Sequence, residues 1–347
     1  MSAYLNTRVS LFSARLWRDD ELDALVSVPD DAVADTLSHR GLAPLAAGYD
    51  SLTAQHQDYR SLEHRIIAQI LDETRVMLRP LSGNARSFLT FWTARFEISN
   101  IKTLLRSKMT GERPAVVLAQ LIPMGAFGRL DTQDLAHAED VVDLLRRLET
   151  GPYAGIVRHA RRAFEQNHDP FSLDAALDRA YYEGLTLRAQ PLEESEGAPF
   201  RSLMASLIDR INLVWLLRYR FNYKLPPAQV YYLLVGSHYS LSGAQLQHLA
   251  ALDTLEAVLA ALPAAWQVRL NGTTDIPSVF ARMESAAAEQ AQRVLHSAAP
   301  AIARAFAYLI LRERDLRAVR AVLRGRHLGL AQVDIRQALQ HQPAEVM

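Results

Sequence analysis

One helical segment occurs three times in this chain of 347 residues, and this repetition limits the possible folds more than any other feature. The three copies lie 112 and 106 residues apart when Arg106, Arg218 and Arg324 are aligned. Each copy has an acidic residue nine positions before this arginine, an asparagine or alanine six positions before it and a second base two positions after it. These positions are Glu97, Asn100 and Lys108 in the first copy, Asp209, Asn212 and Arg220 in the second, and Asp315, Ala318 and Arg326 in the third. Charge bias alone would not fix these residues in one register, so the chain is predicted to contain three related units.

The repeated segment has the pattern of a helix with one buried face. In the first copy Ile98, Ile101, Leu104 and Leu105 recur at helical spacing, so one apolar stripe can pack inward. The acids stand early in each copy and the bases stand late, which suits the helix dipole. Considered singly, these charges are what an ordinary surface helix would carry. Their threefold recurrence favours a shared role.

The rest of the chain also indicates helices. Hydrophobic residues make up 49% of the sequence, so the chain can bury a substantial core. The best strand candidates, Val230–Val235 and Trp266–Leu270, are short and fit buried helix or helix ends better. We therefore predict an all-α fold of three similar helical-bundle units, namely residues 1–113, 114–225 and 226–347.

Capping residues predict where several helices begin. Asp131 is expected to cap a helix that runs to about Leu148, and Ser242 to cap one that runs to about Leu262. Asp169 or Ser172 is expected to cap the helix that follows Pro170.

Composition argues against several classes of protein. Acidic and basic residues balance at 38 each, so net charge gives no support for a nucleic-acid partner. The chain contains no cysteine, which excludes disulfides and thiolate metal sites. Two uncharged stretches, residues 225–252 and 114–128, are interrupted by proline and glycine, so neither is predicted to span a membrane.

The common catalytic motifs for phosphate binding, dinucleotide binding, serine hydrolysis and zinc proteolysis do not occur in the sequence. Residues 19–23, DDELD, do match the DDxxD pattern with which all-helical isoprenoid enzymes hold magnesium, through Asp19, Asp20 and Asp23. Such enzymes need a second acidic cluster on a facing helix, and the sequence offers no good one. Acids in a first helical turn also complement the helix dipole. An isoprenoid-type enzyme stays an alternative, but no catalytic, cofactor or metal residue is predicted.

Five segments carry a resemblance to a known family. They are YLNTRVSLFSARLW (4–17), FWTARFEISNIKTLLRSK (91–108), LDAALDRAYYEGL (173–185), LIDRINLVWLLRYR (207–220) and AYLILRERDLRAVRAVLRGRHLGL (307–330). In this order and spacing the chain resembles the C subunit of archaeal and bacterial V/A-type ATPases, which is similar to the d subunit of the eukaryotic vacuolar enzyme. The segment Leu192–Phe200 and the tail after Leu330 match poorly, and Ala318 replaces an asparagine that is usual in the family.

The resemblance implies a non-catalytic rotor subunit without a cofactor. Members of this family are all-helical, with three similar bundles in a pseudo-threefold arrangement that forms a funnel. The funnel sits on the cytoplasmic face of the membrane ring of proteolipid subunits, peripheral to the membrane. Its socket receives the tip of the central stalk, made of the D and F subunits. Torque then couples ATP hydrolysis or synthesis to proton or sodium-ion transport.

The recurrence of Arg106, Arg218 and Arg324 suggests that these bases face the interior of the funnel and contact the stalk. The competing interpretation is that they pair with acids on neighbouring helices and tie each bundle together. A generic helical-repeat scaffold of some other complex is the alternative function.

Overall fold

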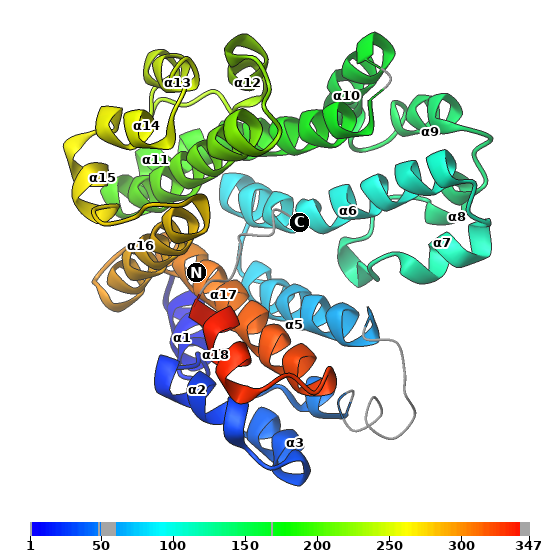
Figure 1. The fold of residues 1–347 in the computed structure, drawn as a ribbon. Helices are drawn as coiled ribbons and strands as arrows, with labels where there is room; N and C mark the ends of the chain where they lie inside the picture. The colour runs from blue at the N-terminus through cyan, green and yellow to red at the C-terminus, as the bar shows by residue number, and fades with distance from the viewer. Residues whose placement is uncertain (1, 48, 50–59, 168, 341–347) are drawn as a thin grey trace.

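The computed structural model describes residues 2–47, 49, 60–167 and 169–340, and its regular elements are helical (Figure 1). The predicted all-α class is confirmed, and both strand candidates fall at the ends of short helices. In this part of the chain, no helix has the combination of length and apolar character that crossing a membrane requires. The α-helices are α1 (Ser2–Ser13), α2 (Asp19–Ser27), α3 (Asp30–His39), α5 (Arg60–Leu78), α6 (Gly83–Thr110), α7 (Pro114–Gln120), α8 (Thr132–Ala136), α9 (Val141–Leu148), α10 (Ala154–Asn167), α11 (Pro170–Leu217), α12 (Pro227–Leu233), α13 (Gly243–Ala250), α14 (Leu255–Ala261), α15 (Ala264–Arg269), α16 (Ile276–His296), α17 (Ala301–His327) and α18 (Gln332–Gln340). A 3-10 turn (Gly125–Phe127) follows α7, and a π turn (Arg218–Asn222) ends α11.

The capping residues confirm the predicted starts of three helices. The side chains of Asp131, Ser242 and Asp169 accept backbone hydrogen bonds as N-caps of α8, α13 and α11. The expected lengths of the first two helices are wrong. Asp140 and Thr254 act as further N-caps, so α9 and α14 begin as separate helices. Each of these side chains offers the backbone a local alternative to continuing the earlier helix.

Three pairs of long helices, each joined by a short turn, organise the molecule. The first pair is α5 and α6, and the third is α16 and α17. The second pair lies within α11, whose halves fold back on each other. A straight helix of this length would separate Phe171 from Tyr219 by roughly 70 Å, whereas their ring centroids are 5.3 Å apart.

Gly197 makes the reversal within α11 possible. Its φ of 69° and ψ of −154° lie in a region that only glycine adopts without strain. Pro199 follows within the first turn of the second half, where its missing amide hydrogen costs no hydrogen bond. Leu192–Phe200, one of the two segments that match the family poorly, therefore contains the turn of the second helix pair.

The repeated helices meet at a cluster of three phenylalanines. Phe88, Phe200 and Phe306 each lie nine residues before the acid of their own copy, and each is 0% exposed. Their ring centroids are 5.0 Å, 5.1 Å and 5.7 Å apart. These separations are those of favourable aromatic pairs. Helices α6 and α17 run in different directions (Figure 1), and the contacts of Phe200 place the start of the second half of α11 beside the starts of both.

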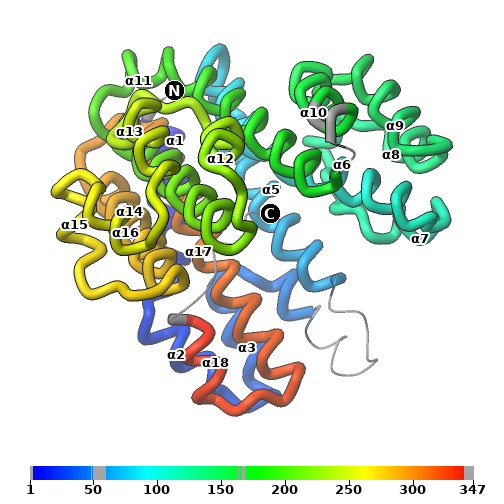
Figure 2. The backbone as a smooth tube through the Cα atoms, turned by 45° about the horizontal axis from the view of Figure 1, so that its top comes forward, coloured from blue at the N-terminus to red at the C-terminus, as the bar shows by residue number. Residues whose placement is uncertain are grey.

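Within the described residues, buried apolar side chains form three clusters. One surrounds the Phe cluster, and another packs α6 against α7–α10 and the first half of α11. The remaining cluster joins the two ends of the chain, because Leu25 and Leu37 pack with Val319 and Val322. Both views show the N-terminal and C-terminal helices side by side (Figures 1 and 2). The unit boundaries at residues 113 and 225 stay a prediction.

The acid of each repeated helix accepts hydrogen bonds from backbone amides that lie just ahead of a short helix. These contacts join Glu97 to Arg129 (2.7 Å) and Leu130 (3.0 Å), Asp209 to Ser240 and Leu241 (both 3.1 Å), and Asp315 to Trp17 (2.8 Å). In every case the amide lies one or two residues before the N-cap of the short helix, which is α8, α13 or α2.

The asparagine of the first two copies holds a second stretch of backbone. Asn212 donates to the carbonyl of Val235 at 3.0 Å and accepts from its amide at 2.8 Å. Asn100 makes the same pair of bonds to Ile122, at 2.9 Å and 2.7 Å. Ala318 cannot make such bonds, so the third copy lacks this contact.

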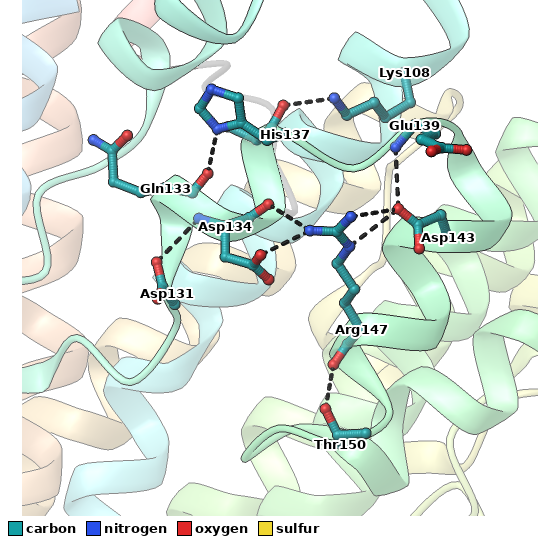
Figure 3. Close-up of polar contacts among 10 residues, drawn as sticks. Lys108, Asp131, Gln133, Asp134, His137, Glu139, Asp143, Arg147 and Thr150 are labelled. Carbon is teal, nitrogen blue, oxygen red and sulfur yellow. Dashed lines mark hydrogen bonds and ion pairs between the residues drawn. The ribbon is translucent and has the colours of Figure 1, made fainter.

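The last base of each repeated helix donates to a carbonyl in the last turn of the same short helix. The donors and acceptors are Lys108 with Ala136 (2.6 Å), Arg220 with Ala250 (3.0 Å), and Arg326 with Val26 (2.9 Å). Figure 3 shows Lys108 donating at the end of α8, and Arg147 of α9, which pairs with Asp134 of α8 and with Asp143 of its own helix. The repeated acid and base therefore bracket one short helix in each copy. In the third copy the bracketed helix comes from the opposite end of the chain.

Candidate functional site

A cavity of about 70 Å³ lies next to the Phe cluster, where α6, both halves of α11, α16 and α17 meet. Its lining continues the buried faces that begin at the phenylalanines. Trp92 and Arg95 follow Phe88 by four and seven positions, and Ile310 and Glu313 follow Phe306 by the same intervals. Residues at these spacings share one helix face.

Ion pairs surround this central cavity. The guanidinium of Arg95 donates to Glu313 at 2.7 Å, and that of Arg317 donates to Glu284 at 2.7 Å. Arg210 also pairs with Glu284. The first contact links α6 to α17. The other two link α17 and the second half of α11 to α16. Together they hold the repeated helices in fixed relative positions.

Burial changes the acidity of groups in and around the cavity. Desolvation raises the pKa of Asp178 to about 6, although Lys102 pairs with it. Desolvation, followed by repulsion from Arg317, lowers the pKa of Arg210 to about 10. Both shifts reflect the cost of keeping a charge away from water.

A larger cleft of about 390 Å³ opens between α5, α6 and α17. Arg106 lines this cleft together with Lys102, Arg317 and Arg320. The guanidinium of Arg106 also donates to Asp174 on α11 at 2.5 Å. The cleft therefore has a mainly basic wall, to which one of the three predicted arginines contributes.

The three predicted contact residues lie far along their helices from the Phe cluster. Arg106, Arg218 and Arg324 each follow the phenylalanine of their own copy by 18 positions, which is roughly 27 Å along a helix. Arg106 and Arg324 are exposed, and Arg218 is half-buried at the start of the π turn. The proposal that they contact a partner stays a prediction.

The acidic turn at residues 19–23 is occupied by protein contacts. Asp19 pairs with Arg314 at 3.0 Å, and Asp23 pairs with Arg336 at 2.7 Å. Glu21 accepts from the amide of Arg18 at 3.0 Å, which closes the first turn of α2. Across the described residues, no group of three histidine, aspartate or glutamate side chains is arranged to hold a metal ion.

Comparison with known proteins places this architecture in a family. The family described as ATP synthase (C/AC39) subunit matches residues 5–338. The chain belongs to that family. The resemblance stated from the five sequence segments is therefore confirmed.

Relatives of this C/AC39 chain carry related names. It is 26% identical to the C subunit of the A-type ATP synthase of Methanocaldococcus jannaschii over 269 residues, which are 75% of this chain and 64% of the relative. It is 21% identical to the corresponding A-type protein of Halobacterium salinarum over 352 aligned positions, covering 97% and 96% of the two chains. The C subunit of a V-type ATP synthase from Deinococcus radiodurans is 26% identical over 187 residues, or 53% and 52%. The matched region thus spans less than two-thirds of the Methanocaldococcus protein.

The sequence interpretation of this C/AC39 chain missed the central cavity. The charged residues of the cavity, among them Arg95, Arg210 and Glu313, lie within the segments that carry the family resemblance. Alignment of the three copies contained a usable signal, because a phenylalanine stands nine positions before each acid. Extending the register upstream would have located the meeting point of the helices.

Proposed function

We propose that this chain is a non-catalytic rotor subunit of a V/A-type ATPase or ATP synthase. It joins the central stalk, made of the D and F subunits, to the proteolipid ring in the membrane. It lies on the cytoplasmic face, peripheral to the membrane, and transmits torque between the two. Rotation then couples ATP hydrolysis or synthesis to proton or sodium-ion transport.

The observation that carries the proposal is the meeting of the three repeated helices at the Phe cluster beside a charged cavity. Three helices that start together and run outward support a pseudo-threefold funnel with its floor at this cavity. Family membership supports the same assignment. A stalk tip seated on the floor would touch all three repeats, so torque applied there would load the three units together.

A torque-transmitting part must be stiff, and buried polar contacts supply stiffness here. Glu73 on α5 accepts from Arg312 of α17 at 3.0 Å and 3.2 Å, and from the hydroxyl of Tyr308 at 2.5 Å. Arg312 is 0% exposed and Glu73 is 4% exposed. A bidentate pair without access to water fixes both distance and orientation of the two helices.

The exposed outer parts of the repeated helices offer surfaces for the partners. Arg106, Arg218 and Arg324 recur at one register in all three copies, and we assign them to stalk contact on that ground. Their replacement by alanine, one at a time, is expected to weaken stalk binding and to leave the melting temperature unchanged. Intact binding with a lowered melting temperature would assign them to bundle stability instead.

Reconstitution tests the proposed function. The purified chain is mixed with the stalk subunits and with detergent-solubilised ring, separately and together, and complexes are measured by size-exclusion chromatography and mass photometry. We expect a stalk–chain complex, a ring–chain complex and a ternary complex, with little stalk bound to the ring alone. A stalk that binds the ring equally well without this chain would refute the linking role.

A further inference from the structure

Four nitrogen donors around the central cavity have no acceptor. They are Trp92 Nε1, Arg95 Nε, Arg210 Nε and Arg317 Nε, and none has a hydrogen-bond partner among the described residues. All four side chains line the cavity, as does Glu284, whose Oε2 also has no hydrogen-bond partner among the described residues. Trp92 is 4% exposed and Arg95 is 7% exposed, whereas the side chains of Arg210 and Arg317 are 16% and 21% exposed and reach the surface. Folded proteins pair the great majority of buried donors, so four in one cavity require an explanation.

The arginines are held in place by their other contacts. Arg95 stacks on the ring of Trp92 at 4.0 Å, donates to the carbonyl of Trp92 at 3.1 Å and pairs with Glu313. Arg317 is fixed by Glu284, which Arg210 also contacts. The free donors therefore belong to side chains that cannot easily turn to find another acceptor. This is the arrangement of a prepared binding site.

The charge of the lining favours an anion. Four arginines, Arg95, Arg210, Arg314 and Arg317, face three acids, Asp178, Glu284 and Glu313. From outside the lining, Lys102 pairs with Asp178 and Asp19 pairs with Arg314, so three arginines and two acids of the lining remain. The low pKa of Arg210, about 10, agrees with an excess of positive charge in a place shielded from water.

The size of the cavity limits the ligand. About 70 Å³ is several times the roughly 10–15 Å³ that one water molecule needs, and far too little for a nucleotide or a folded segment. A carboxylate fits both the volume and the donors, because its two oxygens accept several hydrogen bonds and match arginine geometry.

We propose that the central cavity binds one carboxylate, carried by an aspartate or glutamate side chain at the tip of the inserted stalk. This inference rests on the proposed function, because the stalk supplies the ligand. The carboxylate would accept from the indole and guanidinium donors contributed by α6, α11 and α17. It would thereby fix the rotational position of the stalk relative to all three repeats.

Binding of the stalk subunits to full-length variants tests the inference. Arg317→Gln removes one donor and one charge, and leaves Glu284 paired with Arg210. Arg317→Lys keeps the charge, and Arg75→Gln removes an exposed guanidinium outside the cavity whose partner is Asp72. We expect Kd to rise about tenfold or more for Arg317→Gln, the range of a charged hydrogen bond, less for Arg317→Lys, and less than twofold for Arg75→Gln.

A matched scan identifies the ligand residue. Each acidic residue at the stalk tip is changed to its amide, and the loss of affinity is measured against wild type and Arg317→Gln. One acid-to-amide change in the stalk should weaken binding to the wild-type chain about as much as Arg317→Gln does. The same change should cause almost no further loss of binding to the Arg317→Gln chain. Additive losses at every acid would overturn the inference. If Arg317→Gln does not fold, Arg317→Lys takes its place in the scan.

A second measurement separates the sources of the carboxylate. Melting temperatures of the chain alone are compared in acetate and in chloride at equal ionic strength. In one outcome acetate raises the melting temperature of wild type but not of Arg317→Gln, and both proteins bind the stalk with equal affinity. This outcome would assign the cavity to a free carboxylate and overturn the proposal of a stalk ligand. If acetate has no effect and Arg317→Gln binds the stalk as tightly as wild type, the proposal is also overturned, and water molecules are left as the partners of the donors. A wild-type chain that does not bind the stalk would instead refute the proposed function.

Discussion

The rings of Phe88 and Phe306 meet edge to face with centroids 5.0 Å apart, although 218 residues separate them in the sequence. Phe200 lies against both, and each ring belongs to a different repeated helix. The contact therefore places the start of three similar helices at one point. The central cavity borders this point, so packing of the rings also sets the positions of the arginines around it.

Truncation of the Phe cluster should destabilise the whole chain. Phe306→Ala is expected to lower the free energy of unfolding by about 3–5 kcal/mol, because it removes a fully buried ring and leaves a cavity. Phe88→Ala and Phe200→Ala should have similar effects, since both rings are equally buried. Urea denaturation followed by far-UV circular dichroism measures the change. Val268→Ala, at a side chain 77% exposed, is the control and should change stability by less than about 0.5 kcal/mol.

The sequence predicted the repeated helix and the all-α class because both depend on local periodicity. It also predicted the N-caps Asp131 and Ser242, since a capping side chain bonds to its own neighbours. The family resemblance followed from segments spread along the chain. These features share one property, which is that the signal lies within a few residues of its effect.

The contacts of the repeated acids could not be predicted in this way. Asp315 accepts from the amide of Trp17, 298 residues away, and a backbone amide leaves no mark on the sequence. The turn within α11 depends on a single glycine, Gly197, between helix-forming stretches. The arginines around the central cavity were missed for a related reason. The sequence of a helix alone does not distinguish an arginine that faces a buried cavity from one that faces solvent.

The asparagines of the first two copies should differ from Ala318 in their effect on stability. Asn212→Ala leaves the buried amide and carbonyl of Val235 unpaired, so we expect a loss of about 2–4 kcal/mol. Asn100→Ala should cost less, because Ile122 is only half-buried. Ala318→Asn should bring no gain, since Ala318 is 6% exposed and an asparagine there would bury an amide within an apolar cluster. Thermal and urea unfolding test all three, and a stabilised Ala318→Asn variant would contradict this account.

The buried pair of Glu73 and Arg312 should respond differently to single and double changes. Arg312→Met leaves a buried carboxylate without its partner and should destabilise by about 3–5 kcal/mol. Glu73→Leu strands the guanidinium and should cost a similar amount. The double variant should lose much less than the sum, because neither charge is then left unpaired. A double-mutant cycle from urea unfolding provides the test, and additive losses would show that the pair does not act as a unit.

Asp315 should make stability fall as pH rises from about 4 to about 7. Burial raises its pKa to about 7, which outweighs the hydrogen bond from Trp17 and the nearby Arg312 and Arg314. The unfolded chain releases this proton near a pH of about 3.9. Between these values the folded state binds more protons than the unfolded state, so the free energy of unfolding decreases with pH, by up to about 1.4 kcal/mol per pH unit.

Asp315→Asn removes the titrating group and keeps an oxygen that can accept from Trp17, so it separates charge from hydrogen bonding. Urea titration at several pH values measures the free energy of unfolding of both proteins. Between pH 4 and pH 7 the stability of Asp315→Asn relative to wild type should increase. It should level off above pH 7, where both states of wild type are ionised. Asp209, whose pKa burial raises to about 6, continues to titrate in both proteins and so cancels in the difference. A difference that does not change with pH would mean that Asp315 is ionised in the folded chain throughout this range, with the amide of Trp17 and the neighbouring arginines offsetting its burial.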